Sequence, residues 1–399
     1  MKVVHISATP LAGSPIRIVN ALNKYTDVQA RSINLNAKAY GVLTFPEDLL
    51  WNENKEECED IIREADILHF HHWFDFSSKD NSFKFDFFAA MKKDARHLIH
   101  WHSNPMTISS LAGQSVDSIV SSNIPQMVVA QFHESYYPNA CPVPLIVEVE
   151  SLSPKLEQAE KPVVFFSPSS KRHAYEERWE TKGKPEVVHF LDSLKRERKL
   201  DYRLVENIPF ADCNKMRGEC DIVIDDIVTG GFHTTSLESM ALGKPTFSYM
   251  DARTQMVLSQ LSGTTDCPLI NVRYQDAKNI LRELAENRGL RKEIGQFSRD
   301  WMVKYYSEER MVGSYKRAYS NLLDIGVLYN ERYHDNRKAK LWLYTRVPDL
   351  IWQERRSKEI GLARMALDFL KYKNVREIII QKFPYVRNQV RKIKKIFRA

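Results

Sequence analysis

The sequence predicts an α/β protein of two successive Rossmann-like domains that face a cleft, followed by a basic helical C-terminal extension. Short apolar runs alternate with helical patterns over the first 150 residues, which is typical of βαβ units and a parallel sheet. The alternation restarts after a polar, proline-bounded segment, Ser151–Pro162, which is a plausible linker. At 399 residues, the chain is also too long for one small core.

In the first domain, the short apolar runs predict strands, and a helix follows the loop ATPLAGSP. The helix is expected at Pro15–Lys24. The strands are expected at Lys2–Ser7, Ala65–His72, His97–His102, Asp117–Ser121 and Gln126–Gln131.

The second domain repeats this pattern, and residues 276–326 carry helix periodicity throughout. Strands are expected at Val163–Ser167, Tyr202–Glu206, Asp221–Asp225 and Thr246–Tyr249, and helices at Pro185–Lys195 and Phe210–Glu219. The predicted domains are therefore residues 1–155 and 156–326, with the extension at 327–399.

The formal charge of +7 is unevenly distributed along the chain. Residues 331–399 hold 19 Lys and Arg against 7 Asp and Glu, whereas residues 1–330 hold 39 against 44. Over 385–399, apolar residues recur at helical spacing among basic ones. This pattern favours a basic amphipathic helix that contacts an anionic membrane surface. The simpler interpretation is a solvated helix packed on the body of the protein, or a frayed end. The acidic remainder, and the lack of a recognised motif, argue against nucleic acid as a partner.

Composition also indicates a cytoplasmic protein. The chain has no run of about 18 uncharged apolar residues, and its start, MKVVHISATP, lacks the pattern of a secretory signal. Its five cysteines are scattered without a C-x-x-C pair, which favours reduced thiols over a disulfide framework or a zinc ribbon.

The segment Thr229–Pro245, TGGFHTTSLESMALGKP, follows the predicted strand DIVID and is suited to an anion. Its paired glycines allow the backbone to approach a ligand closely. A short helix is expected to begin near Thr235 or Ser236 and to end at Gly243. Free N–H groups at this helix start would hold a phosphate, and Glu238 in the first turn would accept hydrogen bonds from a ribose.

The stretch SLESMALGKPTFSY resembles the L-E-A-M-A-x-G-K-P signature of GT-B fold, nucleotide-sugar-dependent glycosyltransferases of the retaining glycosyltransferase family 4. Cys220–Ile224 resembles the family's A-D-I-x-V strand, Lys182-Gly183 its K-G, and Phe297–Leu323 its closing helices, which return toward the first domain. The resemblance is clearest over residues 160–325, weaker over 1–150 and absent beyond 330. It implies metal-independent transfer of a sugar from a nucleotide diphosphate donor to a glycan or lipid-linked acceptor, with retention of anomeric configuration.

The resemblance implies roles for the residues that would bind the donor. Glu238 resembles the family's ribose-binding glutamate. The diphosphate turn corresponds to Gly231, Thr234, Thr235 and Ser236.

Further roles concern charge and the acceptor side. Lys182, together with Lys171 or Arg172, resembles the basic pair that neutralises the leaving diphosphate. The family usually has its arginine a few residues before K-G, whereas ten residues separate Arg172 from Lys182. Lys171 and Arg172 therefore both remain candidates for the second cation. Gly13 resembles a glycine that lets the acceptor-side loop approach the donor, and His102 a histidine near the transferred sugar's carbon.

One position departs from the family. Retaining members usually carry a second glutamate, eight residues before the first, that contacts the donor sugar. In this sequence that position is Gly230. Asp225, Asp226 or His233 would then hold the sugar hydroxyls, or the donor makes fewer contacts there. No Asp-x-Asp occurs at a plausible loop position, so neither a metal nor a cofactor is expected.

Simpler interpretations exist for several of these residues. Glu238 lies three residues after Thr235, as in a capping box. Gly13 fits an ordinary turn, and Lys171 and Arg172 fit a solvated loop.

Histidines alternate along two predicted strands, at His69, His71, His100 and His102. They fit either packed, cleft-lining side chains or a metal cluster. Since the first arrangement is the commoner, no metal ligand is predicted, and His5 is expected to be buried in the first strand.

The sequence therefore predicts a glycosyltransferase of cell-envelope polysaccharide or glycolipid synthesis, in the cytoplasm or peripheral on the inner face of the membrane. Two alternatives remain. One is a catalytically inactive GT-B protein that binds sugar nucleotides, which Gly230 favours, and the other is a GT-B sugar-nucleotide epimerase.

Overall fold

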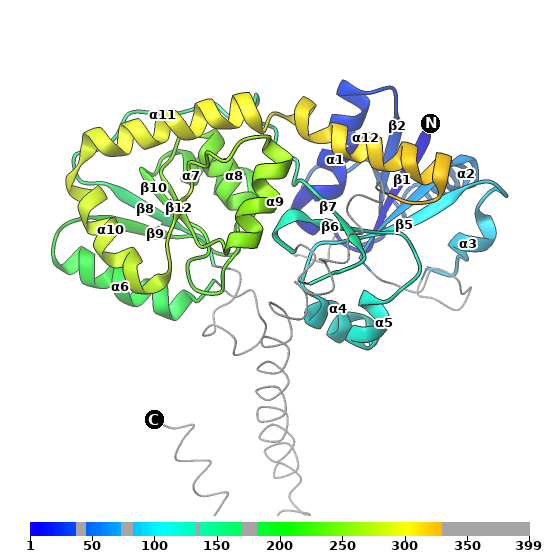
Figure 1. Ribbon diagram of the computed structural model, residues 1–399, viewed down its shortest axis with the longest axis horizontal. Helices are drawn as coiled ribbons and strands as arrows, with labels where there is room; N and C mark the ends of the chain where they lie inside the picture. Colours follow the sequence, from blue (N-terminus) through cyan, green and yellow to red (C-terminus); the bar gives the residue numbers. More distant parts are fainter. Residues whose placement is uncertain (37–44, 73–82, 133–135, 169–181, 329–399) are drawn as a thin grey trace, which may run out of the picture. The chain divides into compact units, whose positions relative to one another are not determined.

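The computed structural model contains two parallel β-sheets with flanking helices, both within one compact unit, Met1–Asp335 (Figure 1). The predicted α/β fold class is confirmed. From residue 329 onward, the predicted basic extension lies outside the described residues. The structure describes residues 1–36, 45–72, 83–132, 136–168 and 182–328.

The first sheet has seven parallel strands in the order β3-β2-β1-β4-β5-β6-β7. β1 and β4 lie at its centre and are almost entirely buried, as expected for strands covered on both faces. The strands are β1 (Lys2–Ser7), β2 (Gln29–Asn34), β3 (Leu49–Leu50), β4 (Ile67–His71), β5 (Arg96–Trp101), β6 (Gln126–Val129) and β7 (Ala140–Val143). The helices are α1 (Ser14–Tyr25), α2 (Lys55–Glu64), α3 (Phe87–Ala90), α4 (Pro105–Ala112) and α5 (Val116–Val120), with 3-10 turns η1 (Leu11–Gly13) and η3 (Ala130–Phe132).

Four of the five strands predicted here are confirmed, as is the helix after the first loop, but the strand predicted at Asp117–Ser121 is wrong. That segment is α5, because the Ser115 side chain accepts a hydrogen bond from the Ser118 N–H at 3.1 Å and caps a helix. The apolar run was too short to separate the two periodicities. Strands β2, β3 and β7 were missed, since their sequences mix polar and apolar residues without a clear pattern.

The second sheet has five parallel strands in the order β12-β11-β10-β8-β9. All four strands and the helices predicted in this half are confirmed, whereas β12 and α9 were not predicted. The strands are β8 (Val163–Phe166), β9 (Asp201–Leu204), β10 (Ile222–Ile224), β11 (Thr246–Ser248) and β12 (Ile270–Asn271). The helices are α6 (Lys184–Arg196), α7 (Phe210–Gly218), α8 (Thr234–Ala241), α9 (Ala252–Ser262), α10 (Tyr274–Glu286), α11 (Arg288–Tyr305) and α12 (Glu308–Ile325).

The final helix returns to the first sheet, as the resemblance implied. α12 packs beside α1 (Figure 1). The Tyr315 hydroxyl donates to the Pro144 carbonyl at 2.8 Å, and Lys316 pairs with Asp27 at 2.5 Å. The predicted domain boundaries themselves stay predictions. No helix in the described part of the chain has the length and apolar character needed to cross a lipid bilayer.

Glycines fix the end of α8. Gly243 has φ +70° and follows the helix; its N–H donates to the Met240 carbonyl and the Lys244 N–H to the Ser239 carbonyl, both at 2.9 Å, which is a Schellman motif. The left-handed glycine predicted at this end is thus confirmed. In α11, a Cβ added to Gly295 would lie 2.3 Å from the Gly243 carbonyl oxygen. α11 therefore packs backbone to backbone against the end of α8.

Gly295→Ala should lower the free energy of unfolding by about 1–3 kcal/mol, because neither backbone atom in this contact can move aside. The matched control is Gly313→Ala in α12, where the nearest atom to an added Cβ is the flexible Arg317 side chain at 3.6 Å. This change should raise stability by about 0.5–1 kcal/mol through helix propensity. Urea unfolding followed by circular dichroism measures both, and equal effects would contradict the close contact.

Candidate active site

The loop between β10 and α8 has a backbone that only its glycines allow. The Asp226 carboxylate accepts the Thr229 N–H at 2.8 Å and also the Thr229 hydroxyl, which tightens the first half of the loop. The Gly231 N–H donates to the Tyr249 carbonyl at 2.7 Å, which ties the second half to the residue after β11. Gly230 has φ +90°, and a Cβ there would lie 3.1 Å from the Tyr249 ring.

This geometry explains the departure from the family at Gly230. A glutamate at that position would need a left-handed backbone and would press against an aromatic ring. Glycine at this position is required by the backbone and is not, by itself, a sign of lost catalysis.

α8 begins at Thr234, slightly earlier than predicted, with His233 as its N-cap residue. The His233 side chain does not cap the helix, and no acidic residue lies in the first turn. Because the first N–H groups of a helix lack intrahelical acceptors and carry partial positive charge, this end suits an anion. The Thr234 and Thr235 side chains beside it are half-buried.

A buried carboxylate, Asp225, organises the charges at this helix end. Its Oδ1 lies 2.7 Å from Lys182 Nζ, while its Oδ2 accepts the His233 N–H at 2.8 Å and the Ser236 hydroxyl at 2.5 Å. Burial alone would raise the pKa of Asp225, but Lys182 and His233 outweigh it and hold that pKa well below its usual range. Asp225 is therefore ionised, and it joins Lys182 to the start of α8.

Lys182 is held in a single position beside α8. Its ammonium group also lies 3.3 Å from the Ser167 carbonyl oxygen and 3.5 Å from the Thr235 hydroxyl. Its backbone is left-handed, with φ +56°, and Gly183 follows with φ +57°. Such a conformation is rare for lysine and is typical of functional sites. The structure thus brings together Lys182, Thr235 and Ser236, as the sequence predicted.

Glu238 lies between two arginines. Its Oε1 is 2.6 Å from Arg17 Nη2 of α1, and its Oε2 pairs with Arg217 of α7. The side chain is only 2% exposed. Burial opposes ionisation, but both arginines lower the pKa of Glu238, so it stays charged. The capping-box interpretation is wrong, because α8 starts at Thr234 and the carboxylate binds side chains.

Arg17 and Arg217 were missed by sequence reasoning. Arg217 belongs to a helix without a clear apolar face. Arg17 follows Gly13 by one turn of α1, and a Cβ at Gly13 would lie 3.9 Å from Arg17 Nε and 3.1 Å from the Phe45 ring. The loop that contains Gly13 therefore lies close to Arg17, which in turn contacts Glu238. A buried arginine on the apolar face of α1 was the available signal.

The remaining predicted residues lie elsewhere. His102 follows β5 in the first sheet, with its Nε2 2.8 Å from His71 Nδ1, and no described contact joins it to the Lys182 cluster. Lys171 and Arg172 lie outside the described residues.

Of the three side chains proposed to hold the donor sugar, two are buried and already accept hydrogen bonds from neighbouring residues. Asp225 and Asp226 are 0% exposed and accept hydrogen bonds within the loop. His233 is 19% exposed, with its Nδ1 3.2 Å from Asp225. It is therefore the one of the three that faces outward.

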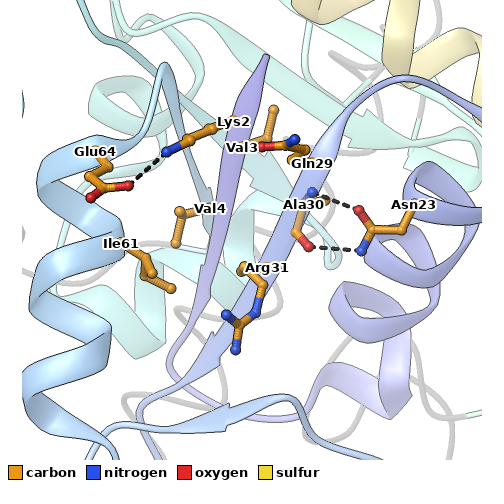
Figure 2. A pocket seen from close by; sticks show the side chains of 9 residues that line it. All are labelled: Lys2, Val3, Val4, Asn23, Gln29, Ala30, Arg31, Ile61 and Glu64. Atoms are coloured by element: carbon orange, nitrogen blue, oxygen red, sulfur yellow. Dashed lines mark hydrogen bonds and ion pairs between the residues drawn. The ribbon is translucent and has the colours of Figure 1, made fainter.

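A separate cavity of about 330 Å³ lies on the first sheet (Figure 2). It is lined by residues from the amino-terminal ends of β1 and β2 and from α1 and α2, including Lys2, whose ammonium group pairs with Glu64 at 2.7 Å. The candidate site lies beyond the carboxyl end of a strand, where ligands bind in such sheets. Since none of the predicted site residues lines this cavity, it is not part of the site.

Asp225→Asn should destabilise the protein by about 3–5 kcal/mol at neutral pH, because it leaves Lys182 buried without a countercharge. The folded-state pKa of Asp225 is depressed, so its contribution is fully present above the ordinary carboxyl value of 3.8 and is lost as pH falls below it. The difference in unfolding free energy between wild type and variant should therefore stay constant from about pH 7 to about pH 5 and shrink as pH falls from there toward about pH 3. Urea titrations measure it, with Asp300→Asn on the exposed face of α11 as control; a pH-independent difference would contradict the ion pair.

No protein-family model matches the sequence, and no curated protein matches it. Solved structures do match. An alpha-glucosyltransferase in complex with UDP and a 13-mer DNA containing a HMU base superimposes with a TM-score of 0.54 at 10% identity, covering 79% of this chain and 98% of that chain.

Two further structures extend this likeness. An alpha-glucosyltransferase in complex with UDP-glucose and DNA containing an abasic site gives a TM-score of 0.54 at 8% identity, with the same coverage. A glycosyltransferase from Rickettsia africae gives a TM-score of 0.50 at 13% identity, covering 81% of this chain and 99% of that chain. At such identities the likeness establishes the fold. The two parallel sheets, with a last helix that returns to the first, form the GT-B fold of these glycosyltransferases.

Proposed function

We propose that the protein is a glycosyltransferase that takes its sugar from a nucleoside diphosphate donor. One observation carries the proposal: Asp225 holds Lys182 against the N-terminal turn of α8, beyond the carboxyl end of β10. The Lys182 ammonium group, two threonine hydroxyls and the first N–H groups of α8 would meet the diphosphate there. The GT-B fold supports this function, because glycosyltransferases share it.

The chemistry at this site consists of stabilising the leaving diphosphate. As the bond between sugar and phosphate breaks, negative charge develops on the phosphate oxygens, and preorganised donors lower the energy of that state. Lys182 and the α8 N–H groups supply such donors, and Asp225 keeps the ammonium group in place. Metal-independent transfer with retention of configuration is part of the proposal.

Glu238 would bind the ribose through lone pairs that the arginines leave available. Each carboxylate oxygen can accept more than one hydrogen bond, and Arg17 and Arg217 each take one. At 2% exposure the carboxylate is covered, so donor binding requires Arg17 and its loop to shift. Arg217 would keep the carboxylate oriented.

The acceptor proposed is a glycan or lipid-linked sugar, in cell-envelope polysaccharide or glycolipid synthesis, reached from the cytoplasmic face of the membrane. The basic residues of 385–399 support an anionic lipid surface as a partner. We propose no nucleic-acid partner, although two similar structures contain DNA, because residues 1–330 carry more acidic than basic side chains.

Lys182→Gln should weaken binding of the nucleoside diphosphate about 10- to 100-fold, because a hydrogen bond to a charged group contributes about 1.5–3 kcal/mol. Asp225 keeps its hydrogen bonds from the His233 N–H and the Ser236 hydroxyl, and circular dichroism checks that the variant is folded at the assay temperature. Lys184→Gln is the matched control, since Lys184 pairs instead with Glu206 at 2.5 Å. Thermal-shift and calorimetric titrations with UDP, GDP, ADP and their sugars measure the difference.

Equal affinities of the two variants would contradict the proposed diphosphate site. Product analysis then separates the alternatives: transfer requires added acceptor, whereas an epimerase changes the donor without one. A protein that binds donor and never consumes it would be the inactive form.

Deleting residues 385–399 should reduce sedimentation with anionic liposomes through the loss of basic side chains, while nucleotide binding stays intact. Neutral liposomes serve as control. Unchanged sedimentation would contradict the membrane contact.

A further inference from the structure

Five histidines gather on one face of the first sheet. His5 of β1 pairs in register with His69 of β4, and His71 of β4 pairs with His100 of β5, which His102 follows. The first four are 0% exposed, and His102 is half-buried. A buried imidazole favours its neutral form, in which the ring carries one nitrogen lone pair.

Within this cluster, His5, His69 and His71 converge. One ring nitrogen of each lies within 4.8 Å of a ring nitrogen of the other two. The closest approach, between His5 Nδ1 and His71 Nε2, is 2.9 Å. Nitrogen ligands around a tetrahedral zinc ion, each about 2.0–2.1 Å from the metal, lie about 3.3 Å apart. The separation between His5 and His71 is close to this spacing, and the His69 nitrogen lies within 4.8 Å of both.

Tyr319 of α12 leaves specific nitrogens available. Its hydroxyl lies 2.7 Å from His69 Nδ1 and 3.2 Å from His5 Nε2. Of the opposite nitrogens, His69 Nε2 has no hydrogen-bond partner among the described residues, while His5 Nδ1 is hydrogen-bonded to His71 Nε2, a bond that metal binding would replace. His71 matches this pattern, because its Nδ1 lies 2.8 Å from His102 Nε2.

We propose that His5, His69 and His71 bind one transition-metal ion through His5 Nδ1, His69 Nε2 and His71 Nε2. Imidazole ligands suit zinc, cobalt, nickel or copper, whereas the absence of a carboxylate from the triad disfavours magnesium and calcium. Each ring's second nitrogen is already oriented by Tyr319 or His102, as in metal sites where an outer partner fixes the histidine. The proposal replaces the expectation that these histidines bind no metal.

A competing triad shares one residue. His71, His100 and His102 also bring ring nitrogens within 4.8 Å of one another, so a single ion at His71 can use only one set. Neither nitrogen of His100 has a hydrogen-bond partner among the described residues. No side chain therefore orients the His100 ring in the way that Tyr319 orients His5 and His69. The first triad is therefore favoured, and His100 is the residue that distinguishes the two.

The site is independent of the proposed sugar transfer. Its three ligands are fully buried between β1, β4 and α12, and no described contact joins them to Lys182 or Glu238. A metal there would join the central strands β1 and β4. Its loss is expected to change stability before it changes nucleotide binding.

The test measures metal in the intact chain, purified without a histidine tag and dialysed against metal-free buffer. Elemental mass spectrometry should find about one zinc or other transition-metal ion per chain, as expected for a three-histidine site. Removal by a chelator should lower the melting temperature, because a ligand that binds the folded state stabilises it. Adding cobalt(II) to the apoprotein should restore the melting temperature and give the visible absorption of tetrahedral cobalt.

Variants assign the ligands. His69→Gln should abolish stoichiometric metal, while His97→Gln, a half-buried histidine of β5 outside the cluster, should retain it. Tyr319→Phe removes the orienting hydroxyl and should weaken metal binding by about 10- to 100-fold, without removing a ligand.

Three results would overturn the proposal. Wild-type protein with far less than one ion per chain, and no cobalt spectrum, would show that the imidazoles are satisfied by hydrogen bonds among themselves. Loss of metal in His100→Gln with retention in His69→Gln would assign the ion to the competing triad. Full retention in both His69→Gln and Tyr319→Phe would place any bound metal elsewhere. If His69→Gln fails to fold, the metal content and cobalt spectrum of the wild type still decide.

Discussion

The candidate site depends on one buried charge. Asp225 is 0% exposed at the end of β10, and a carboxylate in such a place must be matched by donors. Lys182, Ser236 and the His233 N–H supply them. Because these donors come from the turn before α6 and from the start of α8, satisfying one carboxylate positions two separate segments around the place proposed for the diphosphate.

A second ionic group connects the two halves of the fold. Glu238 takes Arg217 from the second sheet's helices and Arg17 from α1 beside the first sheet. A buried carboxylate between two arginines is charged, directional and sensitive to the loss of either partner. If Glu238 binds the ribose as proposed, its ion pair with Arg17 would link nucleotide binding to the position of the Gly13 loop.

The sequence predicted those strands, helices and turns that are determined by the local pattern of residues. The apolar runs of β8, β10 and β11 and the signature of α8 specified the second sheet and its turn, whereas the short run at 116–120 was ambiguous between helix and strand. The pairing of Arg17 and Arg217 with Glu238 was not predictable, because it arises where distant segments meet, although the arginine within the apolar pattern of α1 was a signal that Arg17 has a partner. Gly230 could be recognised as a departure, but only its φ of +90° and the Tyr249 ring explain it.

Tyr319 has a consequence for how the chain folds during synthesis. Its hydroxyl joins His5 and His69, which precede it by 314 and 250 residues, and α12 buries Tyr315 and Leu322 in the same core. The first sheet can pair its strands early, since these are contiguous in sequence. Its interior stays open, however, until the ribosome has released residues beyond 320. If translation stalls before α12 is made, the nascent chain would therefore expose the polar imidazoles and the apolar side chains that α12 later covers. Chaperones and proteases recognise such a state.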